Sequence, residues 1–375
     1  MSWRRLTVVW IGIFSFLFSF FLLIPVLPLF ARDLGLSEAQ IGVALAAFAI
    51  SSMLMRPWAG WATDRFGRRP LMLAGGIVFV LAPLSYSLSA GLVSLTMARL
   101  FHGAGMGLYP TAATAMAADL APAERRAEVM GVFGMAGALA LALGPMTGVT
   151  LAGMAGLPGL FVIASLVGAL GFALTTIVLE TVPARSAAPF SLEATLSRAV
   201  LFPSFLELCL MLTYGALITF LPLHADRQGL NPGVFFFVYA LSLTIVRQPA
   251  GRLSDRYGRP GMVVVSMLLL TAALLIVALS RGPASLIAGG IVYGIGQGIG
   301  QPAMVAWCVD QVGPTERGRA MGTFHTALEL GIAVGAMIAG VTVTQVGFAA
   351  TFIAAATVTL GAGALAATRL NRANA

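Results

Sequence analysis

Apolar runs of about twenty residues recur along the whole chain, and this pattern constrains the fold more than any other feature. A run of that length crosses the hydrocarbon core of a bilayer as an α-helix, at about 1.5 Å per residue. Only 10% of the 375 residues are charged, so polar side chains are too few to cover a water-soluble fold. The strands of an outer-membrane barrel alternate in hydrophobicity, whereas these runs are continuous. We therefore expect an all-α integral membrane protein.

Charged residues and Pro/Gly breaks divide the apolar runs into twelve predicted transmembrane helices. The first six are expected near residues 6–30, 38–62, 70–90, 92–117, 127–153 and 157–180. The second six are expected near residues 204–224, 232–253, 261–281, 284–309, 320–345 and 348–369. The polar stretch 182–202 is the predicted cytoplasmic linker between two six-helix bundles, residues 1–181 and 203–375.

The distribution of arginine predicts how the chain crosses the membrane. All 22 basic residues are Arg, and an N-terminus inside places 16 of them on the cytoplasmic side, 3 outside and 3 within the helices. We expect a multi-pass protein of a bacterial cytoplasmic membrane with both termini inside. The net charge of +8 follows this topology, so we expect no nucleic-acid partner.

The two halves of the chain repeat each other at a constant spacing of 191 residues. This spacing separates Arg56 from Arg247. It also separates a cluster of five glycine, aspartate and arginine residues from a second copy of the same cluster. The cluster consists of Gly60, Asp64, Arg65, Gly67 and Arg68, which recur as Gly251, Asp255, Arg256, Gly258 and Arg259. Two duplicated halves with the same membrane orientation are typical of transporters whose halves rock about a central site. This duplication is not a feature expected of a channel or of a membrane enzyme.

The segment from Gly60 to Arg69 resembles the loop signature between the second and third helices of the major facilitator superfamily. The resemblance implies a cytoplasmic gate in which Asp64 engages the start of the eleventh helix, near Arg319. Gly60 would allow close approach of helices, and Gly67 a tight turn with positive φ. A solvated loop that only sets the topology is the alternative. The expected gate contains both copies of the signature, together with Arg69.

Two further cytoplasmic loops resemble those of the superfamily. One follows the fourth predicted helix and contains Asp119 and Arg125, and the other follows the tenth and contains Asp310 and Arg317. The resemblance implies that these residues clamp helices together and belong to the gate. A charged surface turn explains the same residues equally well.

The fifth predicted helix resembles the antiporter motif of the proton-driven exporters in this superfamily. The matching residues are Gly131, Gly144, Pro145 and Gly148, while Ala140 and Val149 replace two further glycines. The resemblance favours export over uptake. Close helix packing is the alternative explanation, because glycines and a proline also make a bendable, tightly packed helix.

Ionisable residues inside the helices are the candidates for proton coupling. Glu329 lies near the middle of the eleventh helix, with His325 one turn earlier, and this pair could share a proton. Glu207 lies near the cytoplasmic end of the seventh helix, where the alternative is a carboxylate that reaches water. Arg99 and His102 match the fourth-helix motif of the superfamily, with histidine where glutamine is usual. The alternatives are a structural partner for a buried arginine at Glu329 and a snorkelling side chain at Arg99.

The resemblance also implies that the first, fourth, seventh and tenth helices line a substrate cavity. The candidate wall residues are Phe14, Phe18, Phe21, Tyr214, Gln297 and Gln301. Aromatic rings and a few amides suit a small amphipathic molecule, although phenylalanines at helical spacing also serve for packing. Arg56 and Arg247 occupy matching positions. They would attract an anionic or zwitterionic substrate, or would pair with acidic residues nearby.

Together these features predict a secondary active transporter with two six-helix pseudo-repeats, similar to the drug:proton antiporters of the major facilitator superfamily. The segment from Thr219 to His224 suggests the sugar and small-metabolite efflux permeases within that group. We expect proton-coupled export of small amphipathic or polar molecules by a monomer in contact with membrane lipids. The alternative is uptake, by symport or facilitated diffusion, of a small anionic or zwitterionic metabolite. We expect no enzymatic activity, metal or cofactor besides the proton gradient.

Overall fold

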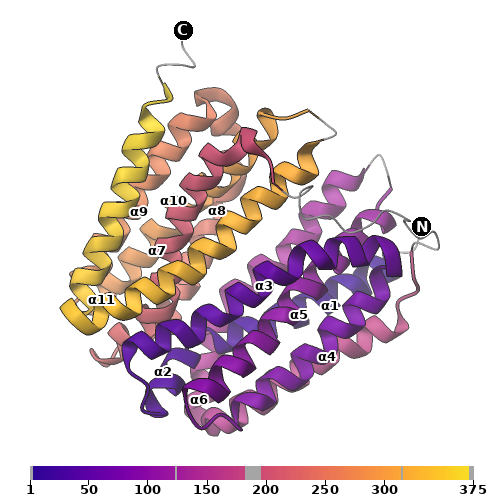
Figure 1. Cartoon of the computed structure of the whole chain (residues 1–375), viewed down its shortest axis with the longest axis horizontal. Helices are drawn as coiled ribbons and strands as arrows, with labels where there is room; N and C mark the ends of the chain where they lie inside the picture. The colour runs from indigo at the N-terminus through magenta and orange to yellow at the C-terminus, as the bar shows by residue number, and fades with distance from the viewer. Residues whose placement is uncertain (1–2, 123–124, 182–195, 314–315, 371–375) are drawn as a thin grey trace. The chain divides into compact units, whose positions relative to one another are not determined.

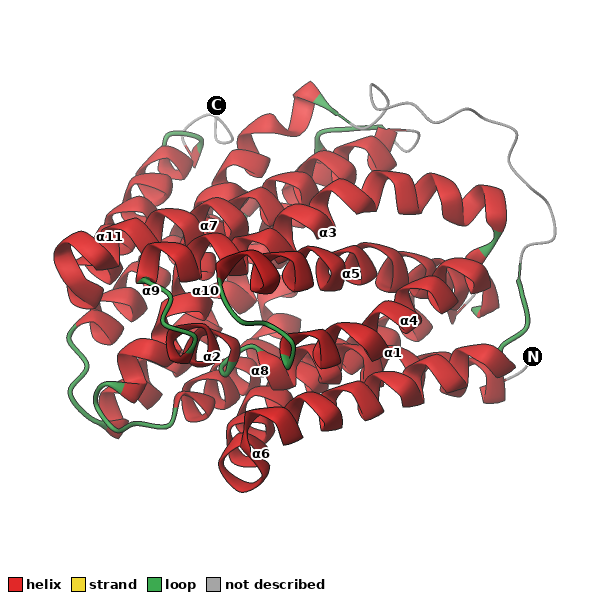
Figure 2. Cartoon of the chain, turned by 60° about the horizontal axis from the view of Figure 1, so that its bottom comes forward, coloured by secondary structure: helices red, strands yellow, loops and turns green. Residues whose placement is uncertain are grey.

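The computed structural model describes residues 3–122, 125–181, 196–313 and 316–370, and the described residues form helices and loops without a strand (Figure 2). The helices of the first half are α1 (Trp3–Leu23), α2 (Leu27–Asp33), α3 (Glu38–Phe66), α4 (Arg68–Tyr86), α5 (Leu92–Leu120) and α6 (Arg126–Ile177). Those of the second half are α7 (Leu201–Asp226), α8 (Pro232–Tyr257), α9 (Arg259–Ala278), α10 (Pro283–Asp310) and α11 (Arg317–Ala367), with the short 3₁₀ helix η3 (Arg198–Val200) before α7 (Figure 1).

Two of these helices each contain a pair of membrane spans. α6 has 52 residues and α11 has 51, which is about twice the length that a bilayer requires. Each is broken at a glycine with positive φ, Gly156 (φ 69°) and Gly347 (φ 82°), which are 191 residues apart. With α1 and α2 counted as one span, the described helices give the twelve predicted spans. By length and composition alone, seven described helices qualify as spans, and the more polar α5, α8 and α10 lie between them in the chain.

The first predicted span, residues 6–30, is not one continuous helix. α1 ends at Leu23 and α2 begins at Leu27, with a turn between them. Pro25 and Pro28 explain the interruption, because proline lacks the N–H group of a helical hydrogen bond and its ring clashes with the preceding turn. The other predicted boundaries agree with the structure to within a few residues.

The chain divides into two compact units, residues 1–35 with 47–191 and residues 36–46 with 192–375. Within the first unit α1 packs on α6, and α4 packs on α5 and α6. Within the second unit α7 packs on α11, and α9 packs on α10 and α11, which repeats the same pattern. The duplicated sequence therefore builds duplicated helix packing.

The repeat extends to individual contacts. Gly103 of α5 lies against the backbone of Phe48, and Gly294 of α10 lies against that of Tyr239, so that each partner is also shifted by 191 residues. Neither glycine has room for a Cβ atom. Small residues at these places let the helix backbones approach closely, as is usual in membrane bundles.

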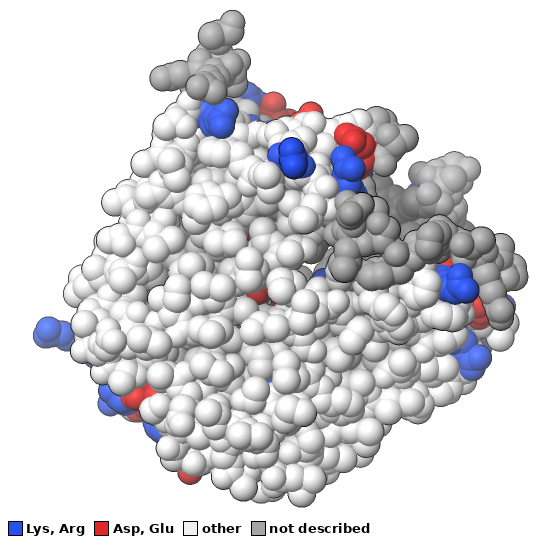
Figure 3. Space-filling model, viewed as in Figure 1, with Lys and Arg blue, Asp and Glu red and all other residues white. Residues whose placement is uncertain are grey.

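The outer surface is apolar. Exposed apolar side chains recur along α6 at helical spacing, at positions Val132, Met135, Leu139, Leu143 and Met146. Most of the face seen in Figure 3 is uncharged. A stripe of this kind would be costly in water but is favourable against lipid. The protein is thus a multi-pass integral membrane protein.

Candidate functional site

The first loop signature is organised around one arginine. Arg68, the first residue of α4, donates from Nη1 to Asp64 Oδ1 at 3.1 Å and from Nε to Asp119 Oδ2 at 3.0 Å. Its Nη1 also donates to the backbone oxygen of Thr63, and its side chain is 12% exposed. The arginine therefore ties together the end of α3, the start of α4 and the end of α5.

The second loop signature repeats this arrangement. Arg259 at the start of α9 donates to Asp255 and, from Nε, to Asp310 Oδ2 at 3.1 Å. The turns before the two arginines are made by Gly67 (φ 102°) and Gly258 (φ 81°), in a region that favours glycine. The positive φ predicted at Gly67 is confirmed.

Glu180 is a member of the first cluster that the sequence did not reveal. Its carboxylate accepts hydrogen bonds from the backbone N–H groups of Arg68 at 3.1 Å and Arg69 at 2.9 Å. These N–H groups lie in the first turn of α4 and have no acceptor within the helix. A negative charge at this end of a helix also interacts favourably with the helix dipole. Arg69 in turn donates from Nη2 to the oxygen of Thr176. The end of α6 thus holds the start of α4.

One expectation about the loop signatures, that Gly60 allows close helix approach, is wrong in this structure. No heavy atom of the described residues lies within 4 Å of a Cβ atom built at Gly60, so this glycine does not mediate close packing. The buried positions on this turn of α3 are instead the neighbouring Ala59 and Ala62. Gly251 is equally open. Arg65 and Arg256 lie over aromatic rings of their own helices, at 5.5 Å from Trp61 and Tyr257 respectively.

In the described part of the chain, the aspartates of the two connecting loops contact neighbouring helices, whereas the ion pairs Arg125–Glu128 and Glu316–Arg319 lie within single turns. Asp119 and Asp310 bind the signature arginines, as described above, whereas Arg125 pairs with Glu128 at 2.7 Å within its own turn. Arg317 is exposed at the start of α11, where Glu316 pairs with Arg319. The two aspartates thus connect neighbouring helices.

A buried polar network lies between α4 and α5 in the first unit. His102 is fully buried, and its Nδ1 shares a hydrogen bond of 2.7 Å with the hydroxyl of Tyr86. Nη1 of Arg99 lies 3.5 Å from the same hydroxyl, and the guanidinium sits 4.4 Å from the centre of the Phe48 ring. Arg99 is 8% exposed, so it does not snorkel to the surface. The structure brings Arg99 and His102 together through Tyr86.

Aromatic rings enclose the His102 imidazole. Its ring centre lies 4.3 Å from that of Phe79, 5.3 Å from Phe48 and 6.1 Å from Phe20, all in edge-on arrangements. Nε2 has no hydrogen-bond partner among the described residues.

Glu207 of α7 is the most deeply buried acid among the described residues. Its exposure is 0%, so the alternative, a carboxylate that reaches water, does not hold in this structure. Gln301 of α10 places its side-chain amide near this carboxyl group as a potential donor, and Tyr293 of α10 lies within electrostatic range of it. In the described part of the chain, neither carboxylate oxygen has a hydrogen-bond donor. A carboxylate in this environment costs several kcal/mol as an anion, by the usual expense of burying an uncompensated charge.

Three tyrosines of the second unit form a cluster near Glu207. The ring centres of Tyr214, Tyr239 and Tyr293 lie 5.7 to 6.5 Å apart. The hydroxyl of Tyr239 donates to Gln297 Oε1, and Gln297 is 5% exposed. Tyr293 occupies the place that His102 occupies in the other half, 191 residues earlier. Both halves therefore bury a polar ring at the same depth of an equivalent helix.

The remaining predicted residues of the second unit are more dispersed. Gln301 and Tyr214 are half-buried, and Arg247 is exposed but lies near enough to Tyr239 to act on it electrostatically. Glu329 is buried at 6% exposure, whereas His325 is exposed and its Nδ1 lies 2.8 Å from the oxygen of Met321. The suggested proton sharing between Glu329 and His325 stays a prediction.

An aromatic ladder runs along α1 in the first unit. Trp10 stacks on Phe14 at 5.7 Å, and Phe14 stacks on Phe18 at 5.4 Å, at successive turns of the helix. All three rings are half-buried. Phe21 is also half-buried, and it packs against Gly144 of α6. Arg56 of α3 is half-buried too. The ladder offers a continuous row of partly accessible ring faces.

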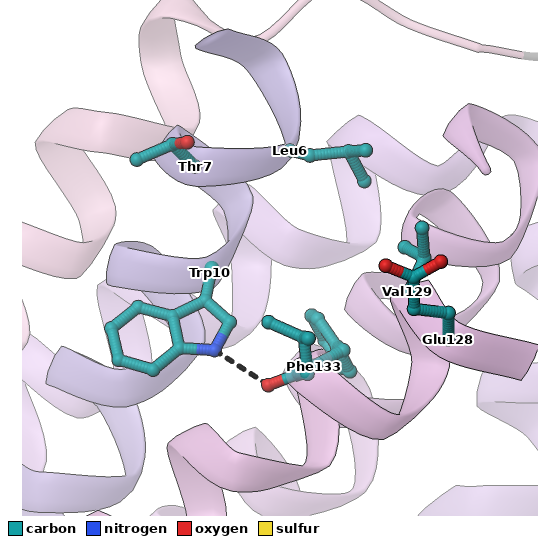
Figure 4. Close-up of a pocket in the computed structure, with 7 residues that line it drawn as sticks. Leu6, Thr7, Trp10, Glu128, Val129 and Phe133 are labelled. Atoms are coloured by element: carbon teal, nitrogen blue, oxygen red, sulfur yellow. Dashed lines mark hydrogen bonds between the residues drawn. The ribbon is translucent and has the colours of Figure 1, made fainter. Parts of the chain in front are cut away.

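At the N-terminal end of this ladder lies a cavity between α1 and α6 (Figure 4). It has a volume of about 210 Å³ and is lined by Leu6, Thr7, Trp10, Glu128, Val129, Val132 and Phe133. The indole N–H of Trp10 donates to the backbone oxygen of Val132 at 2.8 Å, which fixes the ring against the wall. The lining is mostly apolar, with one carboxylate at its edge.

The residues of the antiporter motif fall into two groups. Cβ atoms built at Gly144 and Gly148 would overlap the backbone of α1 at Phe21 and Leu22. Pro145 is buried between them. Gly131, in contrast, has no described heavy atom within 4 Å of such a Cβ atom. Close packing therefore accounts for two glycines of the motif but not for the third.

The sequence matches the model of the Major Facilitator Superfamily over residues 9–246 and again over residues 233–374. It is 21% identical over 382 aligned residues to an uncharacterized MFS-type transporter of Methanocaldococcus jannaschii, with 98% of this chain and 99% of the relative covered. It is 24% identical over 358 residues to the quinolone resistance protein NorA of Staphylococcus aureus, with 90% and 89% covered.

Solved structures share the fold. The human organic anion transporter MFSD10 (TETRAN) aligns with a TM-score of 0.72 at 22% identity, over 98% of this chain and 100% of that one. A POT family transporter in complex with 5-aminolevulinic acid aligns with a TM-score of 0.80 at 14% identity, over 98% and 96%. At these identities the likeness concerns the fold alone.

Proposed function

The chain belongs to the major facilitator superfamily, a family of membrane transporters, and we propose that it is a proton-coupled exporter of small amphipathic molecules. In the proposed cycle, protons and substrate bind alternately within the helical bundle and cross the membrane in opposite directions. The observation that carries the proposal is the buried carboxylate of Glu207.

Glu207 has the properties of a proton carrier. A fully buried carboxyl group without a donor is tolerated when it holds a proton, and it becomes costly when it loses one. Deprotonation would therefore favour a rearrangement that brings water or a donor to the group, and Tyr293 and Gln301 are the nearby polar side chains that would respond. Loss of the proton is in this way coupled to a change in the α7–α10 contact. Glu329, which lies in α11, is the second candidate.

The Arg99–Tyr86–His102 network supports a matching role for the first unit. Tyr86 connects a permanent cation to a titratable imidazole through hydrogen bonds of 3.5 Å and 2.7 Å. A change of protonation at His102 would change which atom donates in the hydrogen bond to Tyr86. That change would reach Arg99 through the shared hydroxyl. We infer that this network responds to the same proton gradient.

The aromatic ladder of α1 and the adjoining cavity support an amphipathic substrate. Stacked, partly accessible rings favour planar apolar groups, and the edge of the cavity offers a carboxylate and a hydroxyl from Glu128 and Thr7. The likeness to a quinolone resistance protein agrees with a substrate of this kind and with export. The resemblance of the fifth span to the antiporter motif also favours export, and Gly131 is the glycine of the motif that packing does not explain.

Uptake of a small anion or zwitterion is the second candidate function. Arg247 favours it, because this exposed arginine lies beside the tyrosine cluster and would attract a negative group there. Under that function the same proton sites would drive substrate and proton in the same direction. We further propose a bacterial cytoplasmic membrane, both termini inside, and a monomeric transporter.

The proton role is tested by following luminal pH in proteoliposomes that carry a proton gradient while a substrate panel is added. The panel contains organic cations, fluoroquinolones, sugars and organic acids. We expect substrate-triggered proton movement in the wild type and its loss in Glu207→Gln, which keeps the shape of the side chain. Glu329→Gln is the matched comparison. Loss of coupling in Glu329→Gln with normal coupling in Glu207→Gln would move the carrier to α11.

A further inference from the structure

The second unit contains a cavity that the transport cycle proposed above does not use. It has a volume of about 500 Å³ and is lined by Arg198, Ala199, Leu201, Phe202, Pro260, Trp307, Gln311 and Arg369. The volume lies within the range of roughly 300 to 1,000 Å³ that is usual for small-molecule sites. We propose that this cavity binds the phosphate group of an anionic membrane lipid.

The charge of the lining selects an anion. Arg198 and Arg369 both line the cavity, and none of the described residues that line it is acidic. Within the described part of the chain, neither arginine takes part in an ion pair. Two guanidinium groups facing one cavity repel each other and attract a phosphate, which they can bind by paired, charge-assisted hydrogen bonds.

The walls of the cavity hold these groups in place. The guanidinium of Arg369 lies 4.5 Å from the centre of the Phe202 ring, and that ring meets Trp307 edge-on at 5.6 Å. In the amide orientation that satisfies both partners, Gln311 accepts from Trp307 Nε1 at 2.9 Å and donates to the oxygen of Ala199. The aromatic side chains and the amide are therefore already engaged with one another, whereas the arginines remain available to a ligand.

The position in the fold points to a lipid as the source of the phosphate. The cavity lies where α7 and α9 begin and where α10 and the last span of α11 end, which is one membrane surface. Leu201 is 53% exposed beside the cavity and gives an acyl chain an apolar path. Basic pockets between helices at a membrane surface are suited to anionic headgroups.

The test uses the full chain and native mass spectrometry with phosphatidylglycerol, with phosphatidylcholine as the zwitterionic comparison. We expect the double variant Arg198→Gln/Arg369→Gln to bind phosphatidylglycerol about tenfold more weakly, as expected for the loss of charge-assisted hydrogen bonds. Arg281→Gln is the control, because Arg281 is an exposed arginine at the opposite end of α9. It should bind as the wild type does. Raised salt should weaken binding in the wild type.

A second measurement distinguishes a lipid phosphate from free inorganic phosphate, and it also shows whether the variants are folded. Unfolding temperature is measured in phosphatidylcholine nanodiscs, in phosphatidylglycerol nanodiscs, and in detergent with inorganic phosphate. We expect phosphatidylglycerol to raise the unfolding temperature of the wild type but not of the double variant, with equal values in phosphatidylcholine. Stabilisation by inorganic phosphate alone, to the same extent, would overturn the lipid assignment. Equal lipid affinity of the wild type and the double variant would overturn the proposed site. If the double variant does not fold, the same comparison is made with the single variant Arg369→Gln.

Discussion

Replacing Gly148 by alanine tests whether the antiporter motif acts through helix packing. A Cβ atom at this position would lie 2.8 Å from the carbonyl carbon of Leu22 and 3.0 Å from its Cα. Comfortable contacts between carbon atoms are about 3.5–4.0 Å. The atoms that block the methyl group belong to the backbone, and the nearest is the carbonyl oxygen of Leu22, so α1 and α6 must separate by roughly 1 Å or more to restore ordinary contact distances. Contacts along the whole α1–α6 seam would loosen.

The expected cost follows from overpacking in a close-packed interior, which is typically about 1–3 kcal/mol. An unfolding entropy of about 2.1 cal/mol/K per residue gives roughly 0.8 kcal/mol/K for 375 residues. The unfolding temperature should therefore fall by about 1–4 °C. Thermal unfolding of the purified protein in detergent, followed by tryptophan fluorescence, measures this shift. Proton-coupled transport should fall in the same variant, because α6 contains the motif.

Gly131→Ala is the control, since it belongs to the same motif but has no described neighbour within 4 Å of the added atom. Alanine favours a helix over glycine by about 1 kcal/mol, so this variant should be neutral or slightly more stable. Gly335→Ala should resemble the packed site, because Gly335 lies against Leu212 of α7 as Gly144 lies against Phe21. Equal unfolding temperatures for Gly148→Ala and Gly131→Ala would refute the packing argument.

Four further predictions concern single side chains. Arg68→Gln should destabilise the protein by about 1–3 kcal/mol, because the partners of the arginine lose their donor. Arg259→Gln should destabilise it less, since the side chain of Arg259 is 23% exposed and that of Arg68 is 12% exposed. Thermal unfolding compares the two variants, and a larger effect at Arg259 would contradict the account. Tyr86→Phe should lower the free energy of unfolding by about 1–3 kcal/mol and weaken proton coupling, because His102 loses its hydrogen-bond partner. Unchanged coupling would exclude the network from the mechanism. Glu180→Ala should cost about 0.5–2 kcal/mol through the uncapped start of α4, and an unchanged unfolding temperature would contradict this role. Trp10→Ala should weaken binding of a fluorescent organic cation, whereas Thr7→Ala, on the same cavity, should have a smaller effect; equal effects would argue against the ladder.

The span boundaries and the duplication were predictable because they rest on hydrophobic runs and on glycines at fixed spacing. Gly156 and Gly347 mark the expected breaks, and the tight turn at Gly67 was anticipated from the preference of glycine for positive φ. The partners of buried polar groups were not predictable in this way. Tyr86 and Tyr293 reach their neighbours through helix packing, which leaves no periodic signal in the sequence.

Other differences arise from the same limit. Asp119 was expected to clamp helices together, but its partner Arg68, which lies 51 residues earlier, could not be named from the sequence. The capping role of Glu180 depends on where α6 ends, next to the start of α4. The burial of Glu207 depends on the side chains of α10 around it. In each case the deciding contact joins helices that are distant in the chain.

The most direct test of proton-coupled export is accumulation of a fluoroquinolone in proteoliposomes with an acidic lumen. An antiporter should concentrate the compound in the acidic lumen above the level in protein-free liposomes, which report passive trapping. The excess should vanish with a protonophore and in Glu207→Gln. Accumulation driven only by an acidic exterior would indicate symport and uptake. If the compound equilibrates across the membrane at the same level with and without a pH gradient, the protein is a facilitator. Either of these two results would contradict the proposed exchange of substrate for protons.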